Sequence, residues 1–228
     1  MKGMDVRFAE VNAAVRAASA GRDPCLVAVS KLQPVSAIRT LALLGQRHFG
    51  ENYVQEALTK QPQLAGLGLE WHLIGPLQSN KCREAARQFD WVQSVDRAKL
   101  IPILARERPS HRLPLNLLIQ VNISDESSKS GCAPALIEDL AQRIEASPGL
   151  RLRGLMAIPA PWPDPNRRRR DFAEMRHLFE RAKAMYPQLD TLSMGMSDDF
   201  ALAVAEGATM VRIGSALFGE RPATRRLA

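Results

Sequence analysis

The sequence predicts an α/β fold: a single (β/α)8 TIM barrel with an extra N-terminal helix, forming one domain over residues 1–228. Three observations support this prediction. Short apolar runs rich in β-branched residues alternate with stretches whose apolar residues recur every three or four positions, as expected for parallel strands linked by helices. The alternation gives eight strand–helix units. No linker rich in Gly, Ser or Pro divides the chain.

The first half of the chain supplies four of the predicted strands. Residues 26–30 (LVAVS) form a continuous apolar run, which is typical of a strand covered on both faces. The helical stretch that follows is expected to end near Gly45, and Asp96 is expected to cap the helix that runs to residue 107. The expected strands are 26–30, 48–50, 70–74 and 91–94, and the expected helices are 34–44, 52–64, 80–89 and 97–107.

The second half repeats the same pattern. Residues 115–121 (LNLLIQV) predict a strong strand, and residues 133–146 predict an amphipathic helix. The Pro-rich stretch 159–165, with the arginines that follow it, is expected to form a loop at the barrel mouth. The expected strands are 115–121, 152–158, 191–194 and 210–213, and the expected helices are 133–146, 171–185 and 198–206.

An open, doubly wound sheet is the alternative architecture, because it also alternates strands and helices. A dinucleotide-binding sheet of this kind carries G-x-G-x-x-G after its first strand, and this sequence does not. Eight units favour the closed barrel.

The positive charge of the chain argues against nucleic-acid binding once its distribution is considered. The formal net charge is +7 and the sequence pI is about 9.8. Only Arg167–Arg170 form a prominent cluster, and most other cations are mixed with Asp and Glu. A nucleic-acid binder concentrates its charge on one surface. We therefore expect the arginines to be solvated.

The cysteines and the apolar runs indicate a cytoplasmic protein that does not enter the membrane. Cys25, Cys82 and Cys132 are odd in number and far apart, which favours neither disulfides nor a zinc site. No apolar run approaches the roughly 20 residues of a membrane span, and residues 1–8 lack the apolar core of a secretory signal. The histidines lack metal-ligand spacing, so we expect no metal site.

In a barrel of this kind, functional groups gather at the C-terminal ends of the strands. Lys31 directly follows the first strand. A lysine at this place either marks the end of the strand in solvent or projects into the mouth. There, desolvation would favour its neutral amine, which attacks aldehydes.

The ends of the last two strands predict an anion site. Ser197 is expected to cap the following helix, Gly214 allows close approach of a phosphate, and Ser215 begins a short helical segment. Ordinary helix capping and a tight turn explain the same residues. Arg212 shares a strand face with Gly214 and needs a polar partner, either an ion pair or a ligand.

Seven stretches then make a family resemblance visible, and they cover nearly the whole chain in order. They are AVSK (28–31), FGENYVQE (49–56), WHLIGPLQSNK (71–81), VNISDESSKSG (121–131), GLMAIP (154–159), LSMGMSDD (192–199) and VRIGSALFG (211–219). The sequence resembles the pyridoxal phosphate homeostasis protein family, which is related in fold to the barrel domain of alanine racemase.

This resemblance implies that pyridoxal 5′-phosphate (PLP) is the cofactor, held reversibly by Lys31 as a lysine aldimine. It further implies that Ser197, Gly214 and Ser215 bind the phosphate, that Arg212 faces the pyridine nitrogen, and that Asn52 lies beside the ring. Members of the family act in vitamin B6 and amino-acid balance and lack an established reaction.

The resemblance therefore predicts a PLP carrier that takes part in PLP homeostasis, with PLP-dependent apo-enzymes as recipients and a monomeric state. The alternative is a PLP-dependent amino-acid racemase of low activity. Racemisation needs a base on each face of the substrate carbanion. Beside Lys31, Tyr53 is the tyrosine near the predicted mouth, and the chain ends soon after the last strand. Tyr53 could supply the second base of a weak racemase, whereas the end of the chain soon after the last strand and the charge of Arg212 both favour the carrier.

Overall fold

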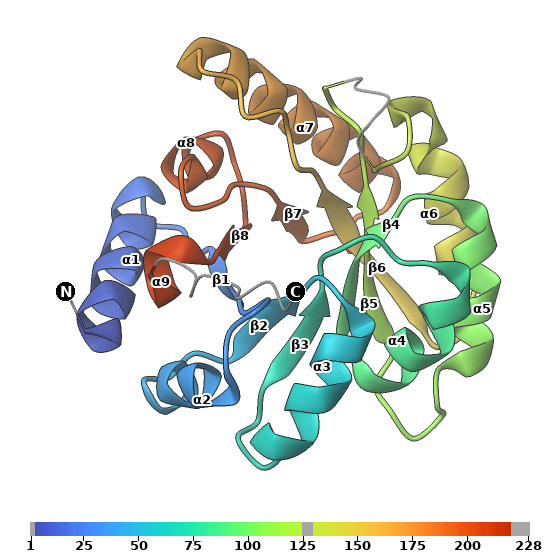
Figure 1. The fold of residues 1–228 in the computed structure, drawn as a ribbon. Helices are drawn as coiled ribbons and strands as arrows, with labels where there is room; N and C mark the ends of the chain where they lie inside the picture. Colours follow the sequence, from blue (N-terminus) through green and yellow to red (C-terminus); the bar gives the residue numbers. More distant parts are fainter. Residues whose placement is uncertain (1–2, 125–129, 220–228) are drawn as a thin grey trace, which may run out of the picture.

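The eight strands form one closed parallel barrel, so the predicted fold class is confirmed. The computed structural model describes residues 3–124 and 130–219, and Figure 1 shows its strands surrounded by helices. The strands follow chain order around the barrel, and pairing of the first strand with the last closes it. They are β1 (Cys25–Val29), β2 (His48–Glu51), β3 (Glu70–Leu73), β4 (Trp91–Val95), β5 (Leu115–Gln120), β6 (Leu150–Met156), β7 (Thr191–Ser193) and β8 (Met210–Ile213).

Helices cover the outside of the barrel, and the first helix is hydrogen-bonded to the last. Arg7 donates hydrogen bonds from Nε to the Leu217 carbonyl (2.8 Å) and from NH2 to the Phe218 carbonyl (3.2 Å). The helices are α1 (Met4–Ala18), α2 (Val35–Leu43), α3 (Val54–Lys60), α4 (Cys82–Gln88), α5 (Ile101–Glu107), α6 (Ile137–Glu145), α7 (Pro165–Met185), α8 (Phe200–Ala205) and α9 (Ser215–Phe218). Short 3-10 helices span Gln61–Leu64, Ser79–Lys81, Ala98–Leu100 and Pro134–Leu136.

Both faces of the strands are buried, which explains why they appear in the sequence as almost continuous apolar runs. A small apolar cluster fills part of the barrel interior, and a larger one packs between the strands and the helices. Alternate residues of a strand face opposite sides. The interior cluster contains Val27, Trp91, Leu118, Met156 and Met210.

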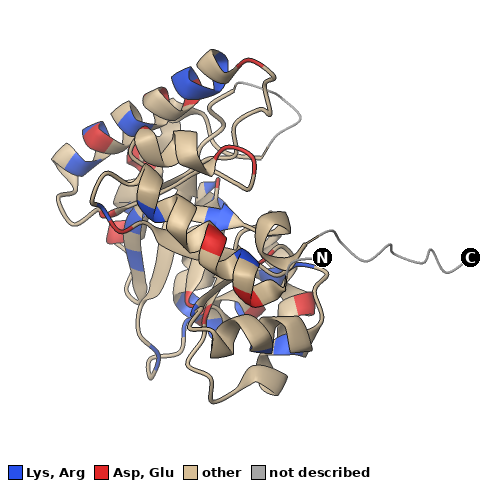
Figure 2. Cartoon of the chain, turned by 90° about the vertical axis from the view of Figure 1, so that its left-hand side faces the viewer, with Lys and Arg blue, Asp and Glu red and all other residues tan. Residues whose placement is uncertain are grey.

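Helix α7 begins six residues earlier than the sequence predicted. The expected loop ran through the arginines, whereas Pro165 is the first residue of the helix. The Asp164 carboxylate caps it by accepting a hydrogen bond from the Asn166 N–H (2.9 Å). An aspartate before a proline is a common start of a helix. Figure 2 shows the resulting group of basic residues at one end of this long helix, and a mixture of basic and acidic residues over the rest of that face.

The predicted cap at Asp96 is wrong. Its carboxylate accepts from the guanidinium of Arg97 (2.6 Å) instead of from the backbone of the following helix. Arg97 is the extended residue at which the 3-10 turn Ala98–Leu100 begins, and no side chain caps that turn. The tight turn leads directly into α5.

The three cysteines are free thiols in a protein whose sequence predicted no disulfide. Cys82 and Cys132 are buried, and Cys25 is half-buried. Burial raises their pKa values, to about 12 for Cys25 and Cys132 and about 11 for Cys82. Among the described residues, no helix has the length and apolar character to cross a membrane.

Candidate functional site

A cavity of about 240 Å³ lies where the C-terminal ends of the strands meet. It brings together three residues that the sequence singled out, namely Lys31, Asn52 and Arg212. They come from the ends of β1, β2 and β8, which are neighbours around the closed barrel. The described residues that line the cavity are Val29, Lys31, Asn52, Ile74, Gly75, Pro76, Gln120, Ser130, Ile158, Met196 and Arg212.

The charge of this cavity is positive. Lys31 and Arg212 contribute two cations, and none of the described lining residues is acidic. A concave site with charge of one sign attracts ligands of the opposite sign. A larger hollow of about 350 Å³ is lined by residues of α6, α7 and the turn before α6. Its charged residues are one acid and one base, Glu138 and Arg181, so its charge is not of one sign. The mouth is therefore the better candidate for binding a small anion.

Lys31 follows β1 in a tight turn that its neighbours hold in place. The Gln33 N–H donates to the Ser30 carbonyl (3.0 Å). Leu32 has a left-handed backbone, with φ of 62°, a strained conformation for a residue with a side chain. Its N–H donates to the Glu56 carboxylate (2.6 Å), which belongs to α3. The backbone on both sides of Lys31 is thus fixed.

A buried ion pair supports this turn from α3. The Lys60 ammonium donates to the Ser30 carbonyl (2.8 Å), to Glu51 (2.8 Å) and to Glu56 (2.7 Å). The Ser30 hydroxyl also donates to Glu51 (2.6 Å). Burial raises the pKa of the Glu51 carboxyl, and the hydrogen bonds from Lys60 and Ser30 lower it in part. Lys60 therefore links β1, β2 and α3 behind Lys31.

Asn52 is positioned by the close approach of the chain after β3. A Cβ atom at Gly75 would lie 2.2 Å from the Asn52 carbonyl oxygen and 2.8 Å from its Cα. Only glycine permits this contact. Tyr53, the candidate second base, is 62% exposed.

Arg212 reaches the cavity from inside the barrel, where it is 3% exposed. Its guanidinium donates to the Ser193 hydroxyl (2.6 Å) and to the Ala157 carbonyl (2.9 Å). Burial lowers the pKa of Arg212 to about 10, and the charge of Asp199 acts in the opposite direction. The guanidinium consequently stays charged at neutral pH.

The hydrogen bonds of Arg212 continue through the barrel. The Ser193 hydroxyl donates to the Gln93 side-chain oxygen (2.7 Å), and the Gln93 nitrogen lies 2.9 Å from Nδ1 of His72. All three of these side chains are fully buried. Burying polar groups is unfavourable unless they are paired, and this chain of contacts pairs them.

Three of the six predicted site residues are not among the lining residues of the cavity. Ser197, Gly214 and Ser215 lie instead after β7 and β8, as the sequence predicted. The Gly214 N–H donates to the Ser197 hydroxyl across a long 3.4 Å. A Cβ atom at Gly214 would lie 3.3 Å from Val29 of β1, so this glycine also eases barrel closure.

The predicted capping role of Ser197 is wrong. Helix α8 begins at Phe200, and Asp199 occupies the position before it. The Asp199 carboxylate accepts from the Met196 N–H (2.7 Å), which folds this loop back on itself. The Ser197 hydroxyl contacts Gly214 instead.

Several lining residues were missed by the sequence analysis. Gln120 is buried near the end of β5 and donates to the Ser130 carbonyl (3.1 Å). A polar residue near the C-terminal end of a mostly apolar strand is the signal that could have identified it. Met196 and Ile158 supply apolar walls and carry no such signal. Residues 125–129 of the motif VNISDESSKSG lie outside the described residues.

Comparisons with known proteins identify the family of this chain. The alanine racemase N-terminal domain matches residues 7–222. A pyridoxal phosphate homeostasis protein of Pseudomonas aeruginosa is 53% identical over 219 residues, 94% of each chain. Its counterpart in Escherichia coli K12 is 49% identical over 217 residues, covering 94% of this chain and 93% of the relative.

Solved structures show the same fold. PipY of Synechococcus elongatus with PLP bound matches with a TM-score of 0.85 and 38% identity, over 95% of this chain and all of that one. Alanine racemase of Corynebacterium glutamicum matches with a TM-score of 0.69 at 18% identity, over 96% of this chain and 62% of that enzyme. At this low identity, the comparison with the racemase shows a shared fold alone.

Proposed function

The chain belongs to the alanine racemase N-terminal domain family, among the pyridoxal phosphate homeostasis proteins, and we propose that it reversibly holds PLP at the barrel mouth. The observation that supports this most is that Lys31, Asn52 and Arg212 share one cavity, with no carboxylate among its described lining residues. PLP combines an aldehyde with an anionic phosphate. The amine of Lys31 suits the aldehyde, and the positive charge of the site suits the phosphate.

The residues of the cavity fit this cofactor. PLP supplies an electrophilic aldehyde and a ring that withdraws electrons. Lys31 holds the aldehyde through its amine, and the tethered turn around it keeps that amine at the rim. Asn52 flanks the ring, while Ser197, Gly214 and Ser215 bind the phosphate beside the cavity.

The charge of Arg212 favours a protein that binds PLP over one that catalyses a reaction with it. A guanidinium that stays charged disfavours protonation of a ring nitrogen beside it, which weakens electron withdrawal by the ring. Racemisation further requires a second base. Tyr53 is largely exposed instead of held in the cavity. The curated relatives are named for homeostasis and not for a reaction.

The first test is covalent attachment at Lys31. Purified protein incubated with PLP should show a long-wavelength absorbance band, and borohydride reduction should leave the added mass on the peptide that contains Lys31. Lys31→Ala should abolish both, since Lys31 is the one lysine among the described residues that line the cavity. Lys99→Ala removes an exposed lysine and should change neither.

The second arm tests the carrier role, with PLP-dependent apo-enzymes as recipients. Loaded wild-type protein should restore activity to such an apo-enzyme, whereas Lys31→Ala should not. D-amino acid formation that depends on Lys31 would instead favour the racemase. The free thiols are consistent with work in the cytoplasm, and we expect a monomer on sizing.

A further inference from the structure

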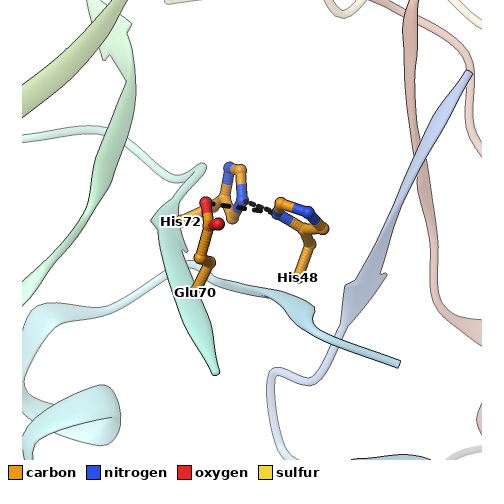
Figure 3. Close-up of side chains that lie close together, drawn as sticks. All are labelled: His48, Glu70 and His72. Atoms are coloured by element: carbon orange, nitrogen blue, oxygen red, sulfur yellow. Dashed lines mark hydrogen bonds and ion pairs between the residues drawn. The ribbon is translucent and has the colours of Figure 1, made fainter. Parts of the chain in front are cut away.

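Two histidines and a glutamate meet at the opposite end of the barrel from the mouth. His48 begins β2 and Glu70 begins β3, and these two residues are partners in the strand register. His72 lies two residues beyond Glu70, so both side chains share one face of β3. Figure 3 shows the two imidazoles and the carboxylate pointing toward one another.

The spacing of the three side chains suits coordination of one metal ion. His48 Nδ1 lies 3.1 Å from His72 Nε2 and 3.5 Å from Glu70 Oε2. One ligand atom from each residue falls within 4.8 Å of the other two. Ligands at about 2.0–2.2 Å from a tetrahedral zinc ion stand about 3.3 Å apart. Small rotations of the side chains would bring all three onto one ion.

Neighbouring groups already orient two of these ligands. The Trp91 indole N–H donates to Glu70 Oε2 (3.0 Å). The same indole ring stacks on His72, with ring centroids 5.1 Å apart and an angle of 13° between planes. Partners that orient ligands are typical of metal sites. Here they restrict Glu70 and His72 before any ion arrives.

Gln93 allows the buried histidine to present the required nitrogen. When Nε2 of neutral His72 binds a metal, its proton resides on Nδ1. The Gln93 side-chain amide lies 2.9 Å from that atom. A flip of the Gln93 side-chain amide by about 180° places its oxygen opposite Nδ1 of His72, where the oxygen accepts a hydrogen bond from the Nδ1 proton. The amide nitrogen then faces Ser193 and can donate to its hydroxyl. Binding thus moves a proton within His72 without releasing one.

The cluster is accessible from solvent, unlike a structural core contact. The His48 side chain is 29% exposed and the Glu70 side chain is 49% exposed, while His72 is buried. The nearby Arg47 guanidinium is occupied by the carbonyls of Ala42 and Gln46. Two imidazoles and one carboxylate, two of them partly exposed to solvent, form a donor set that suits borderline divalent ions.

We propose that His48, Glu70 and His72 bind a divalent transition-metal ion of the zinc type at the base of the barrel. Water completes the coordination, and the ion joins the starts of β2 and β3. The inference does not depend on PLP, because it concerns the opposite end of the strands from Lys31.

Cobalt(II) is the probe, since its coordination is visible by absorbance. Untagged full-length protein, with a parallel PLP-loaded sample, should develop d–d bands that saturate at one equivalent of Co²⁺ and disappear when Zn²⁺ is added. Glu70→Gln and His48→Gln each remove one ligand at a partly exposed side chain, where substitution should leave the protein folded. Each variant should bind Co²⁺ about tenfold more weakly or worse than the wild type.

His111→Gln and His177→Gln are matched controls, because both histidines are exposed and lie outside the cluster. They should bind Co²⁺ like the wild type. The proposal is overturned if excess Co²⁺ produces neither bands nor heat in calorimetry. Equal affinity of the wild type and both cluster variants would also overturn it. Thermal melts of each variant establish that it is folded.

Discussion

At the scale of single residues, Arg212 shows what a charge requires inside a barrel. A buried guanidinium is costly unless its donors are paired. Here Ser193 and Ala157 each accept one hydrogen bond. The position of Arg212 on the inner face was predictable from its strand parity. Its partner was not, because Ser193 lies 19 residues earlier on another strand.

Ser193→Ala is expected to destabilise the protein by about 1–3 kcal/mol, because it leaves a buried donor of Arg212 unpaired. It should also weaken PLP binding, since the guanidinium loses its fixed direction. Urea denaturation measures the first effect and titration of the absorbance band the second. Ser110→Ala, at an exposed serine, should match the wild type in both. Unchanged midpoints for Ser193→Ala would contradict this role.

At the scale of elements, α3 does more than cover the barrel. Its last residue, Lys60, reaches Ser30 and Glu51 and so supports the turn that carries Lys31. Removing one partner from a buried ion pair is far more damaging than removing both.

Lys60→Met should therefore cost about 3–5 kcal/mol in free energy of unfolding. It should also reduce the absorbance band at Lys31, although Lys60 does not line the cavity. The double variant Lys60→Met, Glu51→Gln removes both charges and should recover much of the stability. A double variant no more stable than the single one would show that lost packing dominates.

The pH dependence of stability tests the same pair. Because burial raises the pKa of Glu51, the folded state binds its proton more tightly than the unfolded state. Its contribution favours folding below the ordinary pKa and is lost as pH rises through the raised value. Lys60 opposes this shift, so Lys60→Met should enlarge the loss. Denaturation midpoints from about pH 4 to 8 measure it.

Sequence reasoning located the strands better than the helix starts. The run 26–30, within one residue of β1, was recognisable because both faces of a parallel strand are mostly apolar. Helix starts depend on single contacts. The start of α7 was overlooked although Asp164 and Pro165 are a favourable pair, because the arginines that follow suggested a loop.

At the scale of the whole molecule, barrel closure creates the relationships that sequence spacing hides. His48 and Glu70 are 22 positions apart in the chain and become neighbours through strand register. The mouth was easier to anticipate, because every strand end contributes to it. From Ser193 through Gln93 to His72, buried hydrogen bonds run along the barrel interior between these two ends.

The buried thiols have a practical consequence for studying this barrel. Alkylating reagents attack the thiolate, so Cys82 and Cys132, with pKa values of about 11 and 12, react in proportion to transient opening. Mass spectrometry under native conditions can time each modification separately. Similar rates would indicate that the two sites open cooperatively. Faster alkylation of Cys82 would instead reveal local fraying of α4 while the strands remain joined.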